Sequence, residues 1–321
     1  MVHADTFDEG VVAFERGDYA SALRFFRLAA EHGDAEAQTS LGFMHAEGRG
    51  VARDDSEAVK WYRKAAEQGY IYAQFNLGGM YANGQGVPQN YAEAAKWCRL
   101  AAEQGDASAQ GRFGAICAMG LGVPKDYAEA VKWWRLAADR GDAAAQNNLG
   151  GMHANGQGVQ QNDSEAVKWI RMAAEQGLAD AQFFLGLFYA NDRGVPQDYA
   201  EAVKWWRLAA EQGDAAAQNN LGAMYSRGRG VPQNNAEALK WFCMAAEKGY
   251  ASAQNILGLM YTNGEGVPQN YVSAYMWFIL AASHGFEEGQ KAQTALAGEM
   301  TADQITEAER MAREWMAKHQ R

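Results

Sequence analysis

The sequence is short of proline, short of cysteine and free of long apolar runs. Five prolines stand against 35 glycines in 321 residues, a balance that favours helices separated by flexible breaks. Cys98, Cys117 and Cys243 are an odd number without short spacings, so we expect buried thiols rather than a disulfide framework or a zinc site. No run of about 18 apolar residues occurs, so no segment is expected to span a membrane.

The sequence also lacks an excess of positive charge and any recognisable catalytic set. Its formal net charge is −10, and without a basic stripe we expect no nucleic-acid partner. His45 and His153 share one position of a repeat but lie three repeats apart, so they cannot hold a common metal. The recurrent Gly-x-Gly-Val segments join two helices instead of following a strand, unlike phosphate-binding loops. We therefore expect no enzyme and no cofactor.

What the sequence does contain is a repeat of 36 residues without an insertion. Tryptophan, glycine and glutamine each recur at this step, and all five prolines fall in one column of the repeat. Such a period is typical of a solenoid, in which each unit buries its apolar faces against its neighbours. The tryptophan column is Trp61, Trp97, Trp133, Trp169, Trp205, Trp241 and Trp277.

One unit, residues 69–104, predicts two helices joined by a glycine-rich loop. The first is expected over 71–82 and breaks at Asn83-Gly84-Gln85-Gly86; the second opens at Asn90 and ends before Gly105. Asn90 with Glu93 forms a capping-box pattern, in which we expect the Glu side chain to reach back to the cap. Gly78 lies inside the first helix, where glycine costs about 1 kcal/mol, so its column indicates a close approach. We expect the alanine pairs of the second helices to face these glycines.

The two ends depart from the repeat and predict caps. We expect a helical hairpin over 1–32, seven repeats over 33–284 and closing helices over 285–321. Thr301 and Gln304 form a capping box for a last helix that extends to about Gln320, with Met311 and Trp315 sealing the final apolar face.

The motif Gly-Asp-Ala-x-Ala-Gln-x-x-Leu-Gly-x-Met-Tyr, followed by Gly-x-Gly-Val-Pro and Glu-Ala-x-Lys-Trp, resembles the Sel1-like repeat, a relative of the tetratricopeptide repeat. It is seen with small departures in 213–241. The resemblance implies an all-α, right-handed superhelical solenoid of tandem helix pairs and an adaptor, scaffold or immunity-type role in bacteria. The cysteine-rich secreted branch pairs cysteines within repeats, which this chain does not, so the hydrolytic roles of that branch are not implied.

Specificity is expected where the columns vary between units. On the first helix of each pair, the columns that begin at positions 36, 39, 40, 43 and 47 form one helical stripe, expected on the concave surface. An asparagine amide can both donate to and accept from a peptide unit, and aromatic and arginine side chains are frequent binding hot spots. The candidate binding residues are Tyr72, Phe75, Asn76, Arg112, Asn147, Asn148, Phe183, Phe184, Asn219, Asn220, Arg227 and Asn255.

These observations favour a non-enzymatic adaptor that binds a protein or extended peptide, without membrane insertion and as a monomer. Two alternatives remain open: an immunity-type inhibitor that wraps a toxin or effector enzyme, and a structural scaffold of the cell envelope. A cell-wall or β-lactam hydrolase is disfavoured. The opening Met1-Val2-His3-Ala4 contains a small-x-small pattern, from which we expect a periplasmic or secreted protein whose leader has been removed, with a cytoplasmic location as the alternative.

Overall fold

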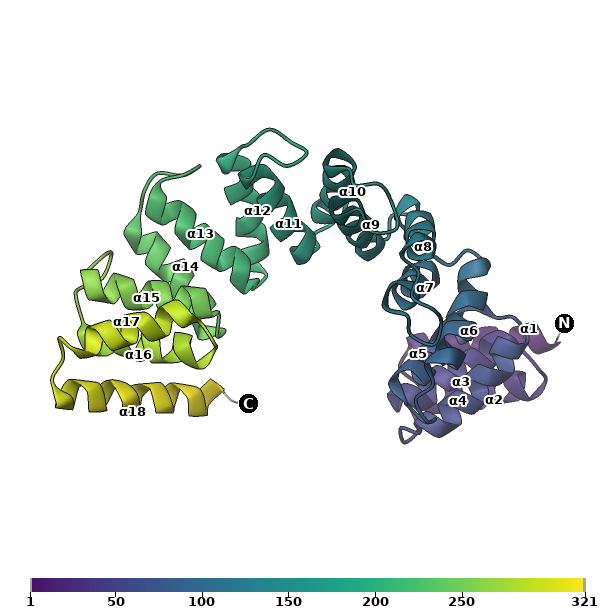
Figure 1. Cartoon of the computed structure of the whole chain (residues 1–321). Coiled ribbons are helices and arrows are strands. Elements are labelled where there is room, and N and C mark those ends of the chain that lie inside the picture. The colour runs from purple at the N-terminus through teal and green to yellow at the C-terminus, as the bar shows by residue number, and fades with distance from the viewer. Residues whose placement is uncertain (1, 320–321) are drawn as a thin grey trace. The chain divides into compact units, whose positions relative to one another are not determined.

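The computed structural model describes residues 2–319, and over these residues the chain is entirely helical. The expectations placed on Met1, Gln320 and Arg321 lie outside this range. The chain divides into two compact units, unit 1 (Met1–Asn162) and unit 2 (Asp163–Arg321). Within each unit, consecutive helices pack in antiparallel pairs, and each pair packs on the next (Figure 1).

The helix bounds repeat with the period of the sequence. Unit 1 holds α1 (Val2–Glu15), α2 (Tyr19–Glu31), α3 (Ala35–Glu47), α4 (Asp55–Glu67), α5 (Ile71–Asn83), α6 (Tyr91–Glu103), α7 (Ala107–Met119), α8 (Tyr127–Asp139) and α9 (Ala143–Asn155). Unit 2 holds α10 (Asp163–Glu175), α11 (Ala179–Ala190), α12 (Tyr199–Glu211), α13 (Ala215–Arg227), α14 (Asn235–Glu247), α15 (Ala251–Asn263), α16 (Tyr271–Ser283), α17 (Glu287–Ala297) and α18 (Ala302–His319). The expected all-helical solenoid of tandem pairs is confirmed.

The second helices of the pairs begin at the predicted caps. The Asn90 oxygen accepts from the backbone nitrogens of Ala92 and Glu93, at 3.0 and 3.1 Å. The glutamates, however, do not reach back as expected. Glu93 instead accepts from the indole nitrogen of Trp97 at 3.1 Å, one helical turn further on. The reciprocal box forms only at α18 among the caps described, where the Thr301 nitrogen donates to Gln304 and the Gln304 nitrogen donates to Thr301.

The two glycines of each loop have different tasks. The first, such as Gly84 at φ 68°, ends the first helix in the left-handed region. The second stacks one pair on the preceding one: a Cβ on Gly86 would collide with the backbone carbonyl of Asp55, and one on Gly122 with that of Tyr91. Asp192 replaces a first glycine and still holds a positive φ of 55°, and its carboxylate accepts from the Gln197 nitrogen at 3.1 Å.

The glycine column inside the first helices makes room for rings. A Cβ on Gly114 would lie 2.8 Å from the Trp134 ring, and one on Gly222 would lie 2.9 Å from the Phe242 ring. The predicted close approach is therefore confirmed, but its partner is not the alanine pair. The bulky side chain one residue after the tryptophan column fills the space, and the alanines are buried elsewhere in the same core.

Successive pairs are joined by buried glutamines. The Gln74 amide donates to the Ala66 carbonyl at 3.2 Å, and the Gln104 amide donates to the Gln74 oxygen at 2.8 Å. Gln182 and Gln212 repeat the second bond, also at 2.8 Å. The column of Gln104 holds Arg140 and Lys248 in two repeats, and the oxygens of Gln110 and Gln218 are buried there without a hydrogen-bond partner among the described residues.

The C-terminal helices break the pattern of pairs. α17 packs on α16 through Gly289, where a Cβ would lie 2.8 Å from the Ala281 Cβ. α18 also packs on α16, along another side of it (Figure 1). As expected, Met311 and Trp315 lie against the last apolar cluster, and the Trp315 and Trp277 rings are 6.3 Å apart.

Candidate functional site

The first helices of unit 1 carry two adjoining hollows, each of about 290 Å³. One is mainly apolar. Its walls come from α1, α2 and α3, with Phe43 in the middle of the exposed stripe. The Phe43 side chain is 42% exposed and its ring meets that of Phe14 at 6.1 Å, edge to face. The side chains that line this hollow are Val11, Phe14, Phe26, Thr39, Ser40, Phe43 and Asn76.

The neighbouring hollow is polar and shares Phe43 and Asn76 with the first. It extends over α5 to Arg112 of α7. The Arg112 guanidinium lies 3.8 Å above the centre of the Phe75 ring and donates to the Phe75 carbonyl at 3.4 Å. Glu47 and Gln85 complete opposite parts of the lining. Three of the sequence-predicted residues, Phe75, Asn76 and Arg112, are thus brought together, with Asn76 between an apolar and a polar hollow.

The two asparagine columns differ in what they can offer. The oxygens of Asn147, Asn219 and Asn255 are buried and have no hydrogen-bond partner among the described residues. In the same column the backbone carbonyl of Phe183 accepts from the Trp206 indole of α12 at 3.1 Å. The next column, that of Asn76, Asn148 and Asn220, is also half-buried. Of its members, Asn76 lines both hollows.

The remaining candidate residues lie apart from the two hollows. Tyr72 is 61% exposed and packs against Tyr70, with ring centres 5.8 Å apart. In unit 2, Phe183 and Phe184 form an edge-to-face pair at 5.5 Å, and Phe184 is exposed. Arg227 ends α13 and is exposed. Sequence reasoning missed Phe43, although its column was included in the stripe; an aromatic residue where neighbouring repeats carry glycine or alanine is the signal that could have found it.

The groups suited to chemistry are dispersed. Burial raises the pKa of the Cys117 thiol to about 11 and also raises the pKa of Cys98. The His153 ring is buried, with Nε2 3.2 Å from a guanidinium nitrogen of Arg135. Residues 2–319 contain no cluster of His, Cys, Asp and Glu that could hold a metal ion. Within the same range no helix is long and apolar enough to cross a bilayer.

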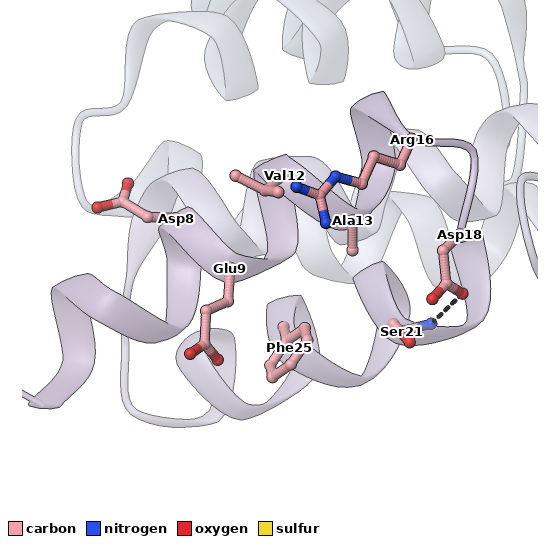
Figure 2. A pocket seen from close by; sticks show the side chains of 8 residues that line it. All are labelled: Asp8, Glu9, Val12, Ala13, Arg16, Asp18, Ser21 and Phe25. Atoms are coloured by element: carbon pink, nitrogen blue, oxygen red, sulfur yellow. Dashed lines mark hydrogen bonds between the residues drawn. The ribbon is translucent and has the colours of Figure 1, made fainter.

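A further hollow, of about 560 Å³, lies on α1 and α2. Figure 2 shows the carboxylates of Asp8 and Glu9 pointing in different directions and Arg16 standing over Val12. The Asp18 carboxylate accepts from the Ser21 nitrogen at 3.1 Å, as an N-cap does. Phe25 occupies the position that tryptophan holds in the later repeats, and there the tryptophan, such as Trp97, packs against the preceding helix pair. This hollow therefore lies on the face of the first pair that corresponds to a contact between pairs in the other repeats.

The comparison with known proteins follows the same repeat frame. The Sel1 repeat model matches eight consecutive segments: 9–34, 35–70, 71–106, 107–142, 143–178, 179–214, 215–250 and 251–286. The chain belongs to the Sel1 repeat family. The first segment covers α2 and the part of α1 from residue 9 onward. No curated protein sequence matches the chain.

Solved Sel1 repeat structures support this assignment. A Sel1 repeat protein from Oxalobacter formigenes is 35% identical, covers 91% of this chain and 89% of its own, and has a TM-score of 0.72. A protective antigen of uropathogenic Escherichia coli, c5321, is 30% identical, covers 99% and 84%, and has a TM-score of 0.50. An immunity protein from Pseudomonas aeruginosa, Pa5087, is 20% identical, covers 66% and 81%, and has a TM-score of 0.41, a likeness that carries no argument about this chain.

Proposed function

We propose that this Sel1 repeat protein is a non-catalytic scaffold that binds an extended segment of a partner protein on the first helices of unit 1. The observation that carries the proposal is the pair of adjoining hollows that share Phe43 and Asn76. Repeat solenoids commonly bind partners along one continuous face, and their folds leave side chains on that face free to vary. The partner is a protein or peptide, and no membrane or nucleic acid is involved.

The chemistry of the two hollows specifies the segment. A large apolar side chain fits the apolar hollow, because Phe14, Phe26 and Phe43 supply most of its walls. The Asn76 amide lies where the backbone of such a segment would leave that hollow, and it can donate to and accept from one peptide unit. In the polar hollow Arg112, held on the Phe75 ring, offers a fixed cation. Glu47 and the Arg53–Asp55 pair line the same hollow, so the expected motif is an apolar anchor followed by a polar, carbonyl-rich stretch.

A display selection of random peptides against the full chain tests this proposal. We expect the selected peptides to share an aromatic or large aliphatic anchor. They should lose at least tenfold in affinity by calorimetry when Phe43→Glu removes an aromatic wall of the apolar hollow and places a negative charge there. Phe43 is exposed, so the variant should keep its helical signal and its unfolding midpoint.

The matched control is Leu259→Glu, which changes an exposed side chain in the same repeat column of α15 in unit 2. Retained binding by Leu259→Glu beside lost binding by Phe43→Glu supports the site. Equal loss in both variants would place the surface elsewhere, and a selection that yields no peptide dependent on Phe43 would remove the proposal.

A further inference from the structure

The outer face of α6, on the second helices of unit 1, contains a hollow of about 400 Å³ separate from the surface proposed above. Ala92, together with the buried Ala95 and the buried Phe113 of α7, forms its apolar part. Lys96, Leu100 and Glu103 stand around it. Leu100 is 37% exposed, and Leu136 and Leu208 in the same column are exposed as well, at 47% and 39%.

Two small side chains accompany this hollow. Ala95 stands in a column that holds Val59, Val131 and Val203 in other second helices. Cys117 stands in the tyrosine column, where Tyr81 accepts from Arg63 at 2.5 Å across the junction of two pairs. Arg99, which occupies the position of Arg63 one repeat later, finds no hydroxyl at Cys117 and donates along its own helix to Glu103 at 2.8 Å. The junction beside α6 is therefore less filled than those with valine and tyrosine.

The chain itself shows what covers this face elsewhere. Five repeats further on, the positions of Ala92, Ala95, Lys96, Arg99 and Leu100 are Val272, Tyr275, Met276, Ile279 and Leu280 of α16. All of them belong to, or pack against, the apolar cluster that contains Ala308 and Ala312 of α18. Leu280 is 0% exposed as a result. An amphipathic helix is thus the natural occupant of this face of a second helix.

The outer faces of α16 and α6 differ in their charged residues. On α16 the lysine and arginine columns have become Met276 and Ile279, which match the apolar side of α18. On α6 they remain Lys96 and Arg99, which pair with Glu93 at 3.7 Å and Glu103 at 2.8 Å. The aliphatic stems of these cations can lie along an apolar helix while their ion pairs meet polar groups at its edge. In α16 the large Tyr275 packs in one cluster with the small, buried Ala308 and Ala312 of α18. The residue at the position of Tyr275 in α6 is Ala95, so a helix lying on α6 has room for a larger side chain at the matching point.

We propose that the hollow on α6 is a second docking site, which binds one amphipathic helix of a partner protein in the way that α18 lies on α16. That helix carries a large apolar residue where α18 carries Ala308, and polar residues along the edge that faces the Lys96–Glu93 and Arg99–Glu103 pairs. The surface is distinct from the two hollows around Phe43, so the chain can hold an extended segment and a helix at the same time.

The probe is a stapled, fluorescent peptide with the sequence of residues 302–319 and the change Ala308→Leu, titrated into the full chain and followed by anisotropy. Its own α18 keeps the α16 face occupied. We expect a dissociation constant in the micromolar range, weakened at least tenfold by Leu100→Glu. Ala95→Tyr, which installs the residue found in α16, should weaken this peptide similarly by filling the hollow.

Leu136→Glu is the matched control, since Leu136 holds the same column on α8 and is 47% exposed. Binding that survives Leu136→Glu and fails with Leu100→Glu supports the site. No binding at millimolar peptide, or equal loss in both leucine variants, would overturn it. Sedimentation of the free chain adds one more outcome: a dimer that Leu100→Glu dissociates would make a second copy the occupant and overturn the proposal of a partner helix.

Discussion

α6 and α16 hold the same place in their helix pairs but differ in what lies on their outer faces. Their inward alanines are equally buried, and both begin at an asparagine cap. On the outer face, however, Leu100 is partly exposed beside charged neighbours, whereas Leu280 is buried beneath α18. The residue types in the inward columns are thus determined by the stacking of helix pairs, which is the same in every repeat. The residue types in the outward columns depend on what covers that particular repeat.

The largest expected difference in stability is between alanine variants of Leu280 and Leu100. Leu280→Ala should lower the free energy of unfolding by about 3 kcal/mol, because it removes a fully buried side chain and leaves a cavity. Leu100→Ala should change it by less than about 0.5 kcal/mol, as exposed positions do. Urea unfolding of the two variants measures the difference. Similar losses in both would mean that α18 does not protect α16.

A second pair of variants concerns glycines inside first helices. Gly114→Ala should destabilise the chain by about 1–3 kcal/mol, because the new methyl group would collide with the Trp134 ring. Gly151→Ala, whose Cβ would meet nothing within 4 Å, should instead stabilise it by up to about 1 kcal/mol through helix propensity. Thermal unfolding followed by circular dichroism gives both signs, and a shift of the same sign in the two variants would refute this account of the glycine column.

The smallest expected change in stability comes from restoring a missing hydrogen bond between the buried glutamines that join successive helix pairs. Lys248→Gln should stabilise unit 2 by about 1 kcal/mol, because the new amide can donate to the unpartnered Gln218 oxygen. It can also keep the bond that Lys248 makes to the Gly213 carbonyl, as Gln212 does with Gly177. Gln212→Lys is the converse change and should cost a similar amount. If Lys248→Gln proves neutral, the buried oxygen is already satisfied in solution.

The sequence predicted the parts of this fold that repeat. Its 36-residue step located the helix breaks, the caps and the columns of buried residues, because each of these is a local requirement met again in every unit. The sequence did not predict the contacts of side chains that could reach more than one partner. The glutamates of the capping boxes pair with lysine or tryptophan, and the helical glycines face rings, neither of which a one-dimensional pattern distinguishes.

The candidate surface was predicted only in outline. The variable columns pointed to the first helices, but Phe43 escaped notice and half of the asparagines turn their oxygens inward. Whether a side chain in these columns is accessible depends on the residues of the neighbouring helix, such as Trp206 of α12, which contacts Phe183 of α11. The hollow on α6 depends likewise on Ala95, a lining residue whose small size matters only once its neighbours are in place.

Photo-crosslinking from position 43 shows whether a bound peptide lies in the apolar hollow of unit 1. Benzoylphenylalanine would replace Phe43 in one variant and Leu259, in the same column of unit 2, in another, and each would be irradiated with a display-selected peptide. We expect a crosslink from position 43 that maps to the apolar anchor of the peptide, and none from position 259. A crosslink from position 259 alone, with none from 43, would contradict this expectation.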